Sequence, residues 1–328
     1  MDLQELFKKI AALKVGVIGD VMLDSYMWGS VDRISPEAPV PIVSLKKKEQ
    51  RVGGAGNVAL NIQALNAMAF VITVTGEDQE AKQLNTLFAS HKINTEYSFS
   101  SKERITTNKT RIISRNQHMM RLDAEITNDL SLSEEEKLLQ HFEVFVEKEK
   151  PDVIILEDYN KGVLTEAVIR SVISTCRKMG IITAVDPKRK NFFAYKHADI
   201  FKPNLKEAKE ALNIITGFVD VSLLQNIHAQ LHNLLQHEVS FITLSEKGIF
   251  YQQQNESEII PSHLRNIADV SGAGDTVIST AALVYAATKE IRLTAKISNI
   301  AGGLVCEEVG TVAIDREKLI HECEALLA

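Results

Sequence analysis

The stretch from residue 153 to residue 185, VIILEDYNKGVLTEAVIRSVISTCRKMGIITAV, indicates the fold class of this protein. It begins with a short apolar run, Val153–Leu156, that is typical of a buried strand. Thr165–Met179 repeats apolar residues at helical spacing, and Ile181–Val185 is strand-like again. Two strands joined through a helix lie parallel in one sheet and form a right-handed crossover. The stretch therefore predicts an α/β protein with a mostly parallel sheet.

The same alternation of strands and helices extends to both sides of this stretch. Before it, strands are predicted at Lys14–Gly19 and Phe70–Thr75. A parallel sheet needs helices on both faces, so we expect a three-layer α/β/α domain. The other predicted elements are helices at 57–69, 77–90, 132–148, 205–212, 274–288, 292–308 and 317–327, and strands at 199–202 and 239–244.

Two segments interrupt the alternation. Tyr26–Gln50 contains three prolines and a strand-like run, and Ile105–Leu122 alternates apolar and polar residues like a hairpin. We expect both to form one small antiparallel sheet, a lid of residues 25–51 and 101–123 beside a core of residues 1–24, 52–100 and 124–328. Such a sheet has an apolar face and no helix to cover it, so we also expect a homodimer joined through the lids.

Composition excludes several classes of protein. The 328 residues are 45% hydrophobic and carry a net charge of −6, which argues against nucleic acid or an anionic membrane as the main partner. The three cysteines have no close spacing, so neither a disulfide framework nor a zinc site is expected. The N-terminal residues do not resemble a signal peptide, and no run of 18 apolar residues occurs. A cytoplasmic protein is expected.

The strongest chemical signal is the sequence DVSGAGDT at Asp269–Thr276, at the start of a predicted helix. Its small residues Gly272, Ala273 and Gly274 would leave N–H groups free at the positive end of the helix dipole, an arrangement that binds anions. Asp275 would lie beside that anion, where a carboxylate can accept the proton of an attacking hydroxyl. The alternative is an ordinary helix start with an acidic first turn.

A second glycine cluster, GGAGN at Gly53–Asn57, precedes a predicted helix. It matches the loose dinucleotide fingerprint, but no buried strand is predicted immediately before it, as that fingerprint requires. A loop that contacts a polar small molecule, with Asn57 as a bidentate side chain, fits better. Three histidines, His228, His232 and His237, share a helical region; a solvated helix face is favoured over a metal site.

These motifs resemble those of the ribokinase-like (PfkB) carbohydrate kinases along nearly the whole chain. The C-terminal family signature matches Asp269 with Gly272–Asp275, and the N-terminal one matches Gly53, Gly54, Asn57, Ala59 and Gly76. Within the family, the chain is most similar to the heptose-phosphate kinases. That similarity lies in GDVMLDSYMWG (19–29), RISPEAPVPIV (33–43), SRNQ (114–117), RLD (121–123) and DYNKG (158–162).

The resemblance implies a role for each matching residue. Asp275 would be the catalytic base, and the N–H groups of Gly272, Ala273 and Gly274 the anion hole for the transferred phosphoryl group. ATP and Mg²⁺ would be required, Glu207 holding Mg²⁺ through water, with K⁺ as a further candidate held by the backbone of Asp269. The sugar-binding positions are Asp24, Gly53, Gly54 and Asn57, and the ATP-binding positions are Asn204, Glu207, Thr243, Ser245, Gly248 and Asn299.

Four further residues are expected to bind the substrate. Asp158 and Lys161 lie in the DYNKG motif after a predicted strand, although a plain strand-to-helix turn is the alternative. Lys109 and Arg111 have the same parity in the lid hairpin, as does Arg115, so their side chains could converge on one phosphate. These cations exceed what a neutral sugar requires.

The resemblance implies ATP-dependent phosphorylation of D-glycero-β-D-manno-heptose 7-phosphate at its anomeric hydroxyl. Another kinase of this family, acting on ribose, fructose or a ketohexose phosphate, is the nearest alternative. A sugar-binding regulator without catalysis is a third, against which the intact Asp275 argues. Heptose kinases of this type are often fused to an adenylyltransferase; that later step is expected on a separate polypeptide.

Overall fold

The computed structural model describes residues 2–115 and 117–327, so Asn116 of the SRNQ motif lies outside the described residues. Its main sheet has eight strands in the order β14-β13-β12-β11-β10-β9-β1-β4. The strand–helix–strand unit predicted at 153–185 is confirmed as β9 (Val153–Glu157), α5 (Glu166–Met179) and β10 (Ile182–Asp186), with β9 and β10 parallel. The last two strands, β13 and β14, are antiparallel to their neighbours, and this hairpin was not predicted.

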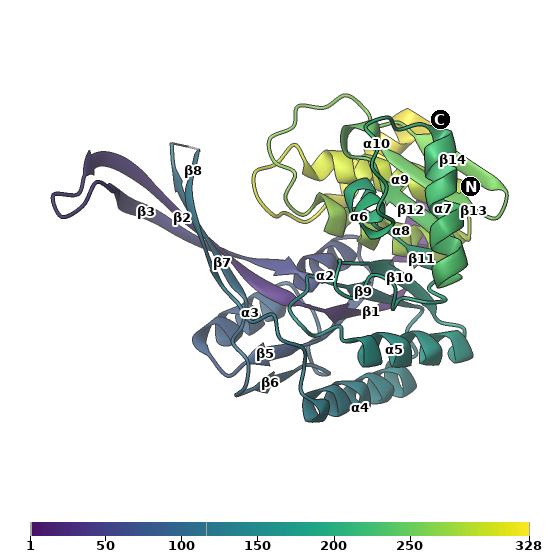
Figure 1. The fold of residues 1–328 in the computed structure, drawn as a ribbon, viewed down its shortest axis with the longest axis horizontal. Helices are drawn as coiled ribbons and strands as arrows, with labels where there is room; N and C mark the ends of the chain where they lie inside the picture. The colour runs from purple at the N-terminus through teal and green to yellow at the C-terminus, as the bar shows by residue number, and fades with distance from the viewer. Residues whose placement is uncertain (1, 116, 328) are drawn as a thin grey trace.

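Helices cover both faces of the sheet, so the three-layer α/β/α fold is confirmed (Figure 1). In β1 (Lys14–Gly19), Val15 and Val17 pack into the apolar core on one face, and Ile18 packs into the core on the other. A Cβ at Gly16 would lie 2.7 Å from a ring carbon of Phe145 on α4, so only glycine allows that helix to approach so closely.

The helices divide between the two faces. The first face is covered by α1 (Leu3–Ile10), α2 (Ala55–Ala64), α8 (Ala273–Thr288), α9 (Ile291–Val305) and α10 (Arg316–Leu327). The second is covered by α4 (Leu132–Glu149), α5, α6 (Leu205–Ala211) and α7 (Val221–Leu235). The other elements are α3 (Gln79–Ser90), β4 (Met68–Ile72), β5 (Val74–Gly76), β6 (Phe99–Ser101), β11 (Ile200–Phe201), β12 (Val239–Thr243), the 3₁₀ turn η1 (Ser245–Lys247), β13 (Ile249–Gln253) and β14 (Glu256–Ile260).

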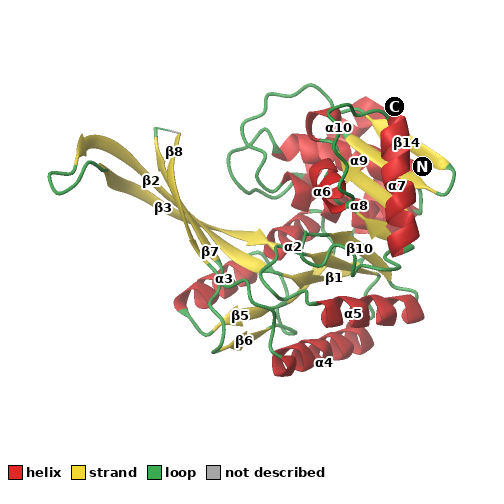
Figure 2. Cartoon of the chain, viewed as in Figure 1, coloured by secondary structure: helices red, strands yellow, loops and turns green. Residues whose placement is uncertain are grey.

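A second sheet stands away from the core, as Figures 1 and 2 show. Its four strands have the order β3-β2-β7-β8, where β2 is Val21–Ile34, β3 is Pro41–Gly54, β7 is Asn108–Ser114 and β8 is Gln117–Ala124. The hairpin predicted at 105–122 is confirmed as β7 and β8, and 26–50, where only a strand-like run was predicted, belongs to a second antiparallel hairpin, β2 and β3. Because β2 and β7 pair in parallel, the sheet is mixed and not antiparallel as predicted. The prediction was wrong on this point because alternation within a strand carries no information about the direction of its neighbour. We call this sheet the lid.

Several predicted boundaries differ from the structure. The helix predicted at 57–69 is α2, which begins at Ala55 and ends at Ala64, followed by Asn66 with φ of 67°. The strand predicted at 70–75 is divided between β4 and β5, which belong to different sheets. No helix in the described part of the chain is long and apolar enough to cross a membrane.

Candidate active site

The first turn of α8 forms the centre of the candidate site. Gly272 is the N-cap of this helix with φ of 80°, a conformation that favours glycine. A Cβ at Gly272 would also lie 2.8 Å from the Asn57 side-chain nitrogen and 2.9 Å from the Thr311 methyl group. Glycine therefore lets the helix start approach two other segments. Because α8 has 16 residues, its free N–H groups and dipole favour an anion here.

Asp275 lies in this turn and is buried. The Asn57 amide donates to its Oδ2 at 2.7 Å, and the Tyr159 hydroxyl donates to its Oδ1 at 2.7 Å. Burial raises the pKa of Asp275 to about 6, and the negative charge of Asp186 acts in the same direction. The two hydrogen bonds and Lys202 act against it. A carboxylate with a pKa close to neutral is suited to accept and release a proton.

A cluster of charged side chains lies next to Gly274. A Cβ at Gly274 would be 3.7 Å from Asp186 Oδ2 and 3.8 Å from Lys202 Nζ. Lys202 pairs with Asp186 at 2.7 Å, and Lys188 lies 3.4 Å from the other oxygen of Asp186. Burial opposes ionisation of Asp186, but Lys188 and Lys202 outweigh it and lower the pKa of this carboxyl. Lys202 therefore lies beside the helix start, and Lys188 lies near the other oxygen of Asp186.

The sequence analysis did not identify these charged residues. Asp186 ends β10, Lys188 follows it, and Lys202 follows β11, so all three lie at the carboxyl ends of parallel strands. Ligands bind at this edge of an open α/β sheet, which was the available signal. Glu157, at the end of β9, was also missed. Burial, with Asp186 and Asp275 nearby, raises its pKa well above the ordinary value, which favours its protonated form.

The predicted ATP-binding residues lie in three places. Asn204 and Glu207 form a capping box on α6: Glu207 N donates to Asn204 at 2.9 Å, and Asn204 N donates to Glu207 at 2.8 Å. Glu207 also accepts from Lys188 at 2.9 Å, which joins this helix start to the charged cluster. The other members are Thr243 at the end of β12, Ser245 and Gly248 around η1, and Asn299 on α9, whose amide donates to the Pro261 carbonyl at 2.7 Å.

The predicted sugar-binding residues meet at the root of the lid. Asp24, which was assigned to the core, lies within the lid strand β2, and a Cβ at Gly53 would come within 2.3 Å of its Oδ2. Arg111 donates to Asp24 at 2.5 Å, and the Thr311 hydroxyl donates to it at 3.1 Å. Since Thr311 also lies against Gly272, these contacts connect the lid to the start of α8.

Lys109 and Lys161 meet at one carboxylate. Glu125, directly after β8, accepts from Lys161 at 2.7 Å and lies 3.5 Å from Lys109 Nζ. Lys109 also pairs with Asp123 at 3.3 Å. The structure thus brings together one cation from the lid and one from the core. Arg115 is exposed in the hairpin turn beyond β7, so its parity places it on neither face of the strand.

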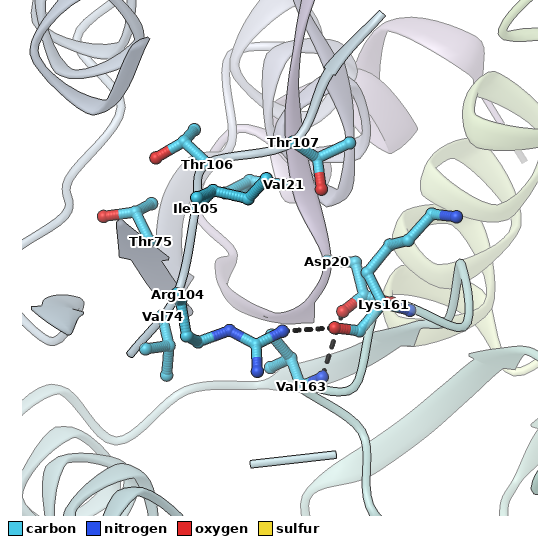
Figure 3. Close-up of a pocket in the computed structure, with 10 residues that line it drawn as sticks. All are labelled: Asp20, Val21, Val74, Thr75, Arg104, Ile105, Thr106, Thr107, Lys161 and Val163. Atoms are coloured by element: carbon cyan, nitrogen blue, oxygen red, sulfur yellow. Dashed lines mark hydrogen bonds between the residues drawn. The ribbon is translucent and has the colours of Figure 1, made fainter. Parts of the chain in front are cut away.

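The loop that carries Tyr159 and Lys161 is fixed by hydrogen bonds from its backbone to the Asp20 carboxylate. Asp20 accepts from the backbone N–H groups of Tyr159 and Lys161 at 2.9 Å each, and of Val163 at 3.1 Å. Arg104 donates to the Lys161 carbonyl. Figure 3 shows Asp20, Arg104, Lys161 and Val163 in the lining of a cavity of about 10 Å³, which has room for one water.

Asp158 is buried in the same loop and already has partners. The Tyr195 hydroxyl donates to it at 2.7 Å, and so does the backbone N–H of Asn160. These contacts favour the alternative, a strand-to-helix turn, over contact with substrate. Substrate contact was expected, because both arrangements place a carboxylate after a strand and the sequence does not show which groups hydrogen-bond to it.

The Asp269 carboxylate forms hydrogen bonds with two segments, at Ser271 and at Gly310. Its Oδ1 accepts from Ser271 N at 3.0 Å and from the Ser271 hydroxyl at 2.9 Å, and its Oδ2 accepts from Gly310 N at 2.9 Å. The carboxylate therefore fixes the backbone of these two segments. In residues 2–115 and 117–327, no three His, Cys, Asp or Glu side chains could hold a metal ion by themselves.

The prediction that the three histidines form a solvated helix face is wrong. His228 and His237 are buried, and His237 is not on α7 but precedes β12. The Ser240 hydroxyl lies 2.8 Å from His228 Nδ1 and 2.6 Å from His237 Nε2. The prediction was wrong because two of the rings point into the core between α7 and the sheet.

Comparison with known proteins identifies the family. The family model of the pfkB carbohydrate kinases matches residues 12–318. The chain belongs to the pfkB family of carbohydrate kinases. The protein is therefore an ATP-dependent carbohydrate kinase, and the start of α8 with Asp275 lies within the matched residues.

Two relatives of this pfkB kinase are both named bifunctional protein HldE. The one from Geotalea uraniireducens is 36% identical over 98% of this chain and 65% of that protein. The one from Aliarcobacter butzleri is 39% identical over 95% of this chain and 64% of that protein. The chain therefore spans just under two thirds of their length.

Two solved structures share the fold. Phosphofructokinase-2 from Escherichia coli in complex with potassium has a TM-score of 0.79, with 17% identity over 96% of this chain and 99% of that chain. Arabidopsis thaliana ribokinase complexed with ribose and ATP has a TM-score of 0.72, with 17% identity over 94% and 99%. At this identity the likeness concerns the ribokinase-like fold alone.

Proposed function

We propose that this pfkB kinase phosphorylates the anomeric hydroxyl of D-glycero-β-D-manno-heptose 7-phosphate, giving the 1,7-bisphosphate for ADP-heptose and lipopolysaccharide core synthesis. The observation that carries the chemistry is Asp275, a buried carboxylate in the first turn of α8, where the N–H groups of Gly272 and Gly274 lie; the Ala273 N–H donates to the Val270 carbonyl at 3.3 Å. The heptose motifs and the HldE relatives, which align with almost the whole chain, support the choice of sugar.

In the proposed reaction, Asp275 accepts the proton of the sugar hydroxyl while that oxygen bonds to the γ-phosphorus of ATP. The bond from phosphorus to the bridging oxygen breaks and ADP leaves. Negative charge spreads over the transferred oxygens, where the helix N–H groups and Lys202 can stabilise it.

Mg²⁺ would neutralise phosphate charge when bound. Glu207 is suited to hold it through a water molecule and not directly, because each oxygen of its carboxylate already accepts a hydrogen bond, one from Asn204 N and one from Lys188. The segments joined by Asp269 could hold K⁺ through backbone carbonyls. The three buried cysteines are unpaired, in keeping with a cytoplasmic enzyme. The relatives are bifunctional by name, so we assign any adenylyl transfer to residues outside this kinase or to another polypeptide.

We assign the 7-phosphate of the sugar to Lys109 and Lys161. Both are largely buried and share Glu125, which a phosphate could replace as their anionic partner. Arg111 is different, because its partner Asp24 is itself proposed to bind the sugar. Removing Arg111 would disturb both functions, so the lysines give the cleaner test.

The test compares acceptors and variants in a coupled ADP-release assay. Lys161→Met and Lys109→Met should raise KM for heptose 7-phosphate about tenfold or more, the usual scale for a lost charged hydrogen bond. They should leave activity on the unphosphorylated heptose nearly unchanged. Lys190→Met, which removes a lysine paired with Asp129 at the surface, is the matched control.

Two outcomes would contradict the proposal. Equal losses on both acceptors would indicate that the lysines act only on the structure. A wild-type preference for ribose, fructose or a ketohexose phosphate would overturn the heptose assignment while leaving the kinase chemistry intact.

A further inference from the structure

Tyr159 contacts the candidate base, although the sequence analysis gave this residue no role. Its hydroxyl donates to Asp275 Oδ1 at 2.7 Å, and the Asn57 amide donates to Oδ2 at 2.7 Å. One donor on each oxygen fixes the plane of the carboxylate. Each oxygen still has a lone pair free for a further proton donor.

The tyrosine remains a donor across the working pH range. Burial, together with the negative charges of Asp275 and Asp186, raises its pKa well above the ordinary value. The hydroxyl therefore does not compete with Asp275 for a proton. It can only stabilise the ionised carboxylate, since a hydrogen bond to the charged form favours that form.

The position of this hydroxyl is fixed at the backbone and at the ring. Asp20 accepts from the Tyr159 backbone N–H at 2.9 Å and from Lys161 N in the same loop. Lys188 Nζ lies 5.6 Å from the centre of the Tyr159 ring and pairs with Glu207 on α6. The loop after β9 is thereby joined to the nucleotide side of the candidate site.

We propose that Tyr159 is a positioning residue that orients Asp275 and keeps it ionised at neutral pH inside a buried site. This inference rests on the proposed role of Asp275 as the base. Without the hydroxyl, burial and the neighbouring Asp186 would favour the protonated carboxyl, which cannot accept the sugar proton. Lys202, which pairs with Asp186, acts in the opposite direction, and burial raises the pKa of the neighbouring Glu157 and so favours its uncharged form.

The test measures Asp275 directly and then through catalysis. In protein labelled with ¹³C-aspartate, the Asp275 carboxyl signal is identified by its loss in Asp275→Asn and followed against pH. In Tyr159→Phe its titration midpoint should rise by about one pH unit, the scale of a hydrogen bond to a charged group. The pKa that defines the acid limb of the kcat/KM profile should rise by the same amount, so that the variant loses activity mainly at low pH.

Tyr97→Phe is the matched control, because the Tyr97 hydroxyl also donates to a carboxylate, Glu149, at 2.9 Å. Tyr97→Phe should change neither the titration midpoint of Asp275 nor the acid limb of the kcat/KM profile. Thermal melts should show that Tyr159→Phe and Tyr97→Phe both fold. An unchanged Asp275 midpoint in Tyr159→Phe would overturn the inference. A raised midpoint with an unmoved acid limb would support the effect of Tyr159 on Asp275 and would overturn Asp275 as the base.

Discussion

Asp275 is held between opposing electrostatic influences. Burial and Asp186 favour its protonated form, whereas Asn57, Tyr159 and Lys202 favour its ionised form. A buried carboxylate beside an anion site is unfavourable for binding alone, because it repels the phosphate. A carboxylate in this position is suited to proton transfer.

Asp275→Asn removes the basic oxygen while keeping the size of the side chain. We expect kcat to fall by about two to four orders of magnitude, the usual scale for loss of a general base. ATP and sugar affinities measured by calorimetry should change little. Retention of more than about a tenth of the wild-type kcat would contradict the assigned role.

Two buried histidines, His228 on α7 and His237 just before β12, can titrate when the protein unfolds. Burial lowers the pKa of His228 to about 4 and that of His237 to about 3, with the neighbouring histidines acting in the same direction. Both rings are therefore neutral in the folded protein. On unfolding they regain ordinary values near 6.5, so the unfolded chain binds more protons once the pH falls below that value.

The free energy of unfolding should therefore be at its full value above about pH 6.5 and decrease as the pH is lowered toward about 4. Each histidine contributes a slope of up to about 1.4 kcal/mol per pH unit in that range. His237→Gln should flatten the slope, even if it lowers stability at pH 7. The measurement is urea unfolding at several pH values, with His263→Gln, at an exposed position, as control. An equal slope in both variants would contradict this explanation.

The lid exposes apolar side chains at the scale of the whole molecule. All eight residues of β8 are exposed, and this edge strand carries Met120 and Leu122, which are 57% and 54% exposed. Their equal parity places them on one face of the strand. Apolar side chains on an unpaired edge favour association with another surface.

We therefore expect the homodimer to form through the lids. Met120→Glu should shift the protein toward monomer in light scattering coupled to size-exclusion chromatography, because a charge in an apolar interface must be desolvated. Met179→Glu is the matched control, since Met179 on α5 is 52% exposed and lies outside the lid. A wild-type monomer at micromolar concentration, or an unchanged mass in Met120→Glu, would contradict lid-mediated pairing.

The sequence by itself determined the features that depend on neighbouring residues. Apolar spacing located β9, α5 and β10, because burial of one face imposes a local period. DVSGAGDT located the start of α8, because a left-handed N-cap and a close approach both require glycine. The position of Asp275 in the first turn of α8 and the hairpin of β7 and β8 followed from the same kind of local pattern.

Only the tertiary structure decided the contacts between distant segments. Tyr159 and Asp275 are 116 residues apart, and their contact exists because β9 and α8 meet at the same edge of the sheet. Likewise, the parallel pairing of β2 with β7 and the burial of His237 depend on which elements pack together. Side-chain chemistry sets what each residue can do, but packing decides which partner reaches it and whether water is excluded.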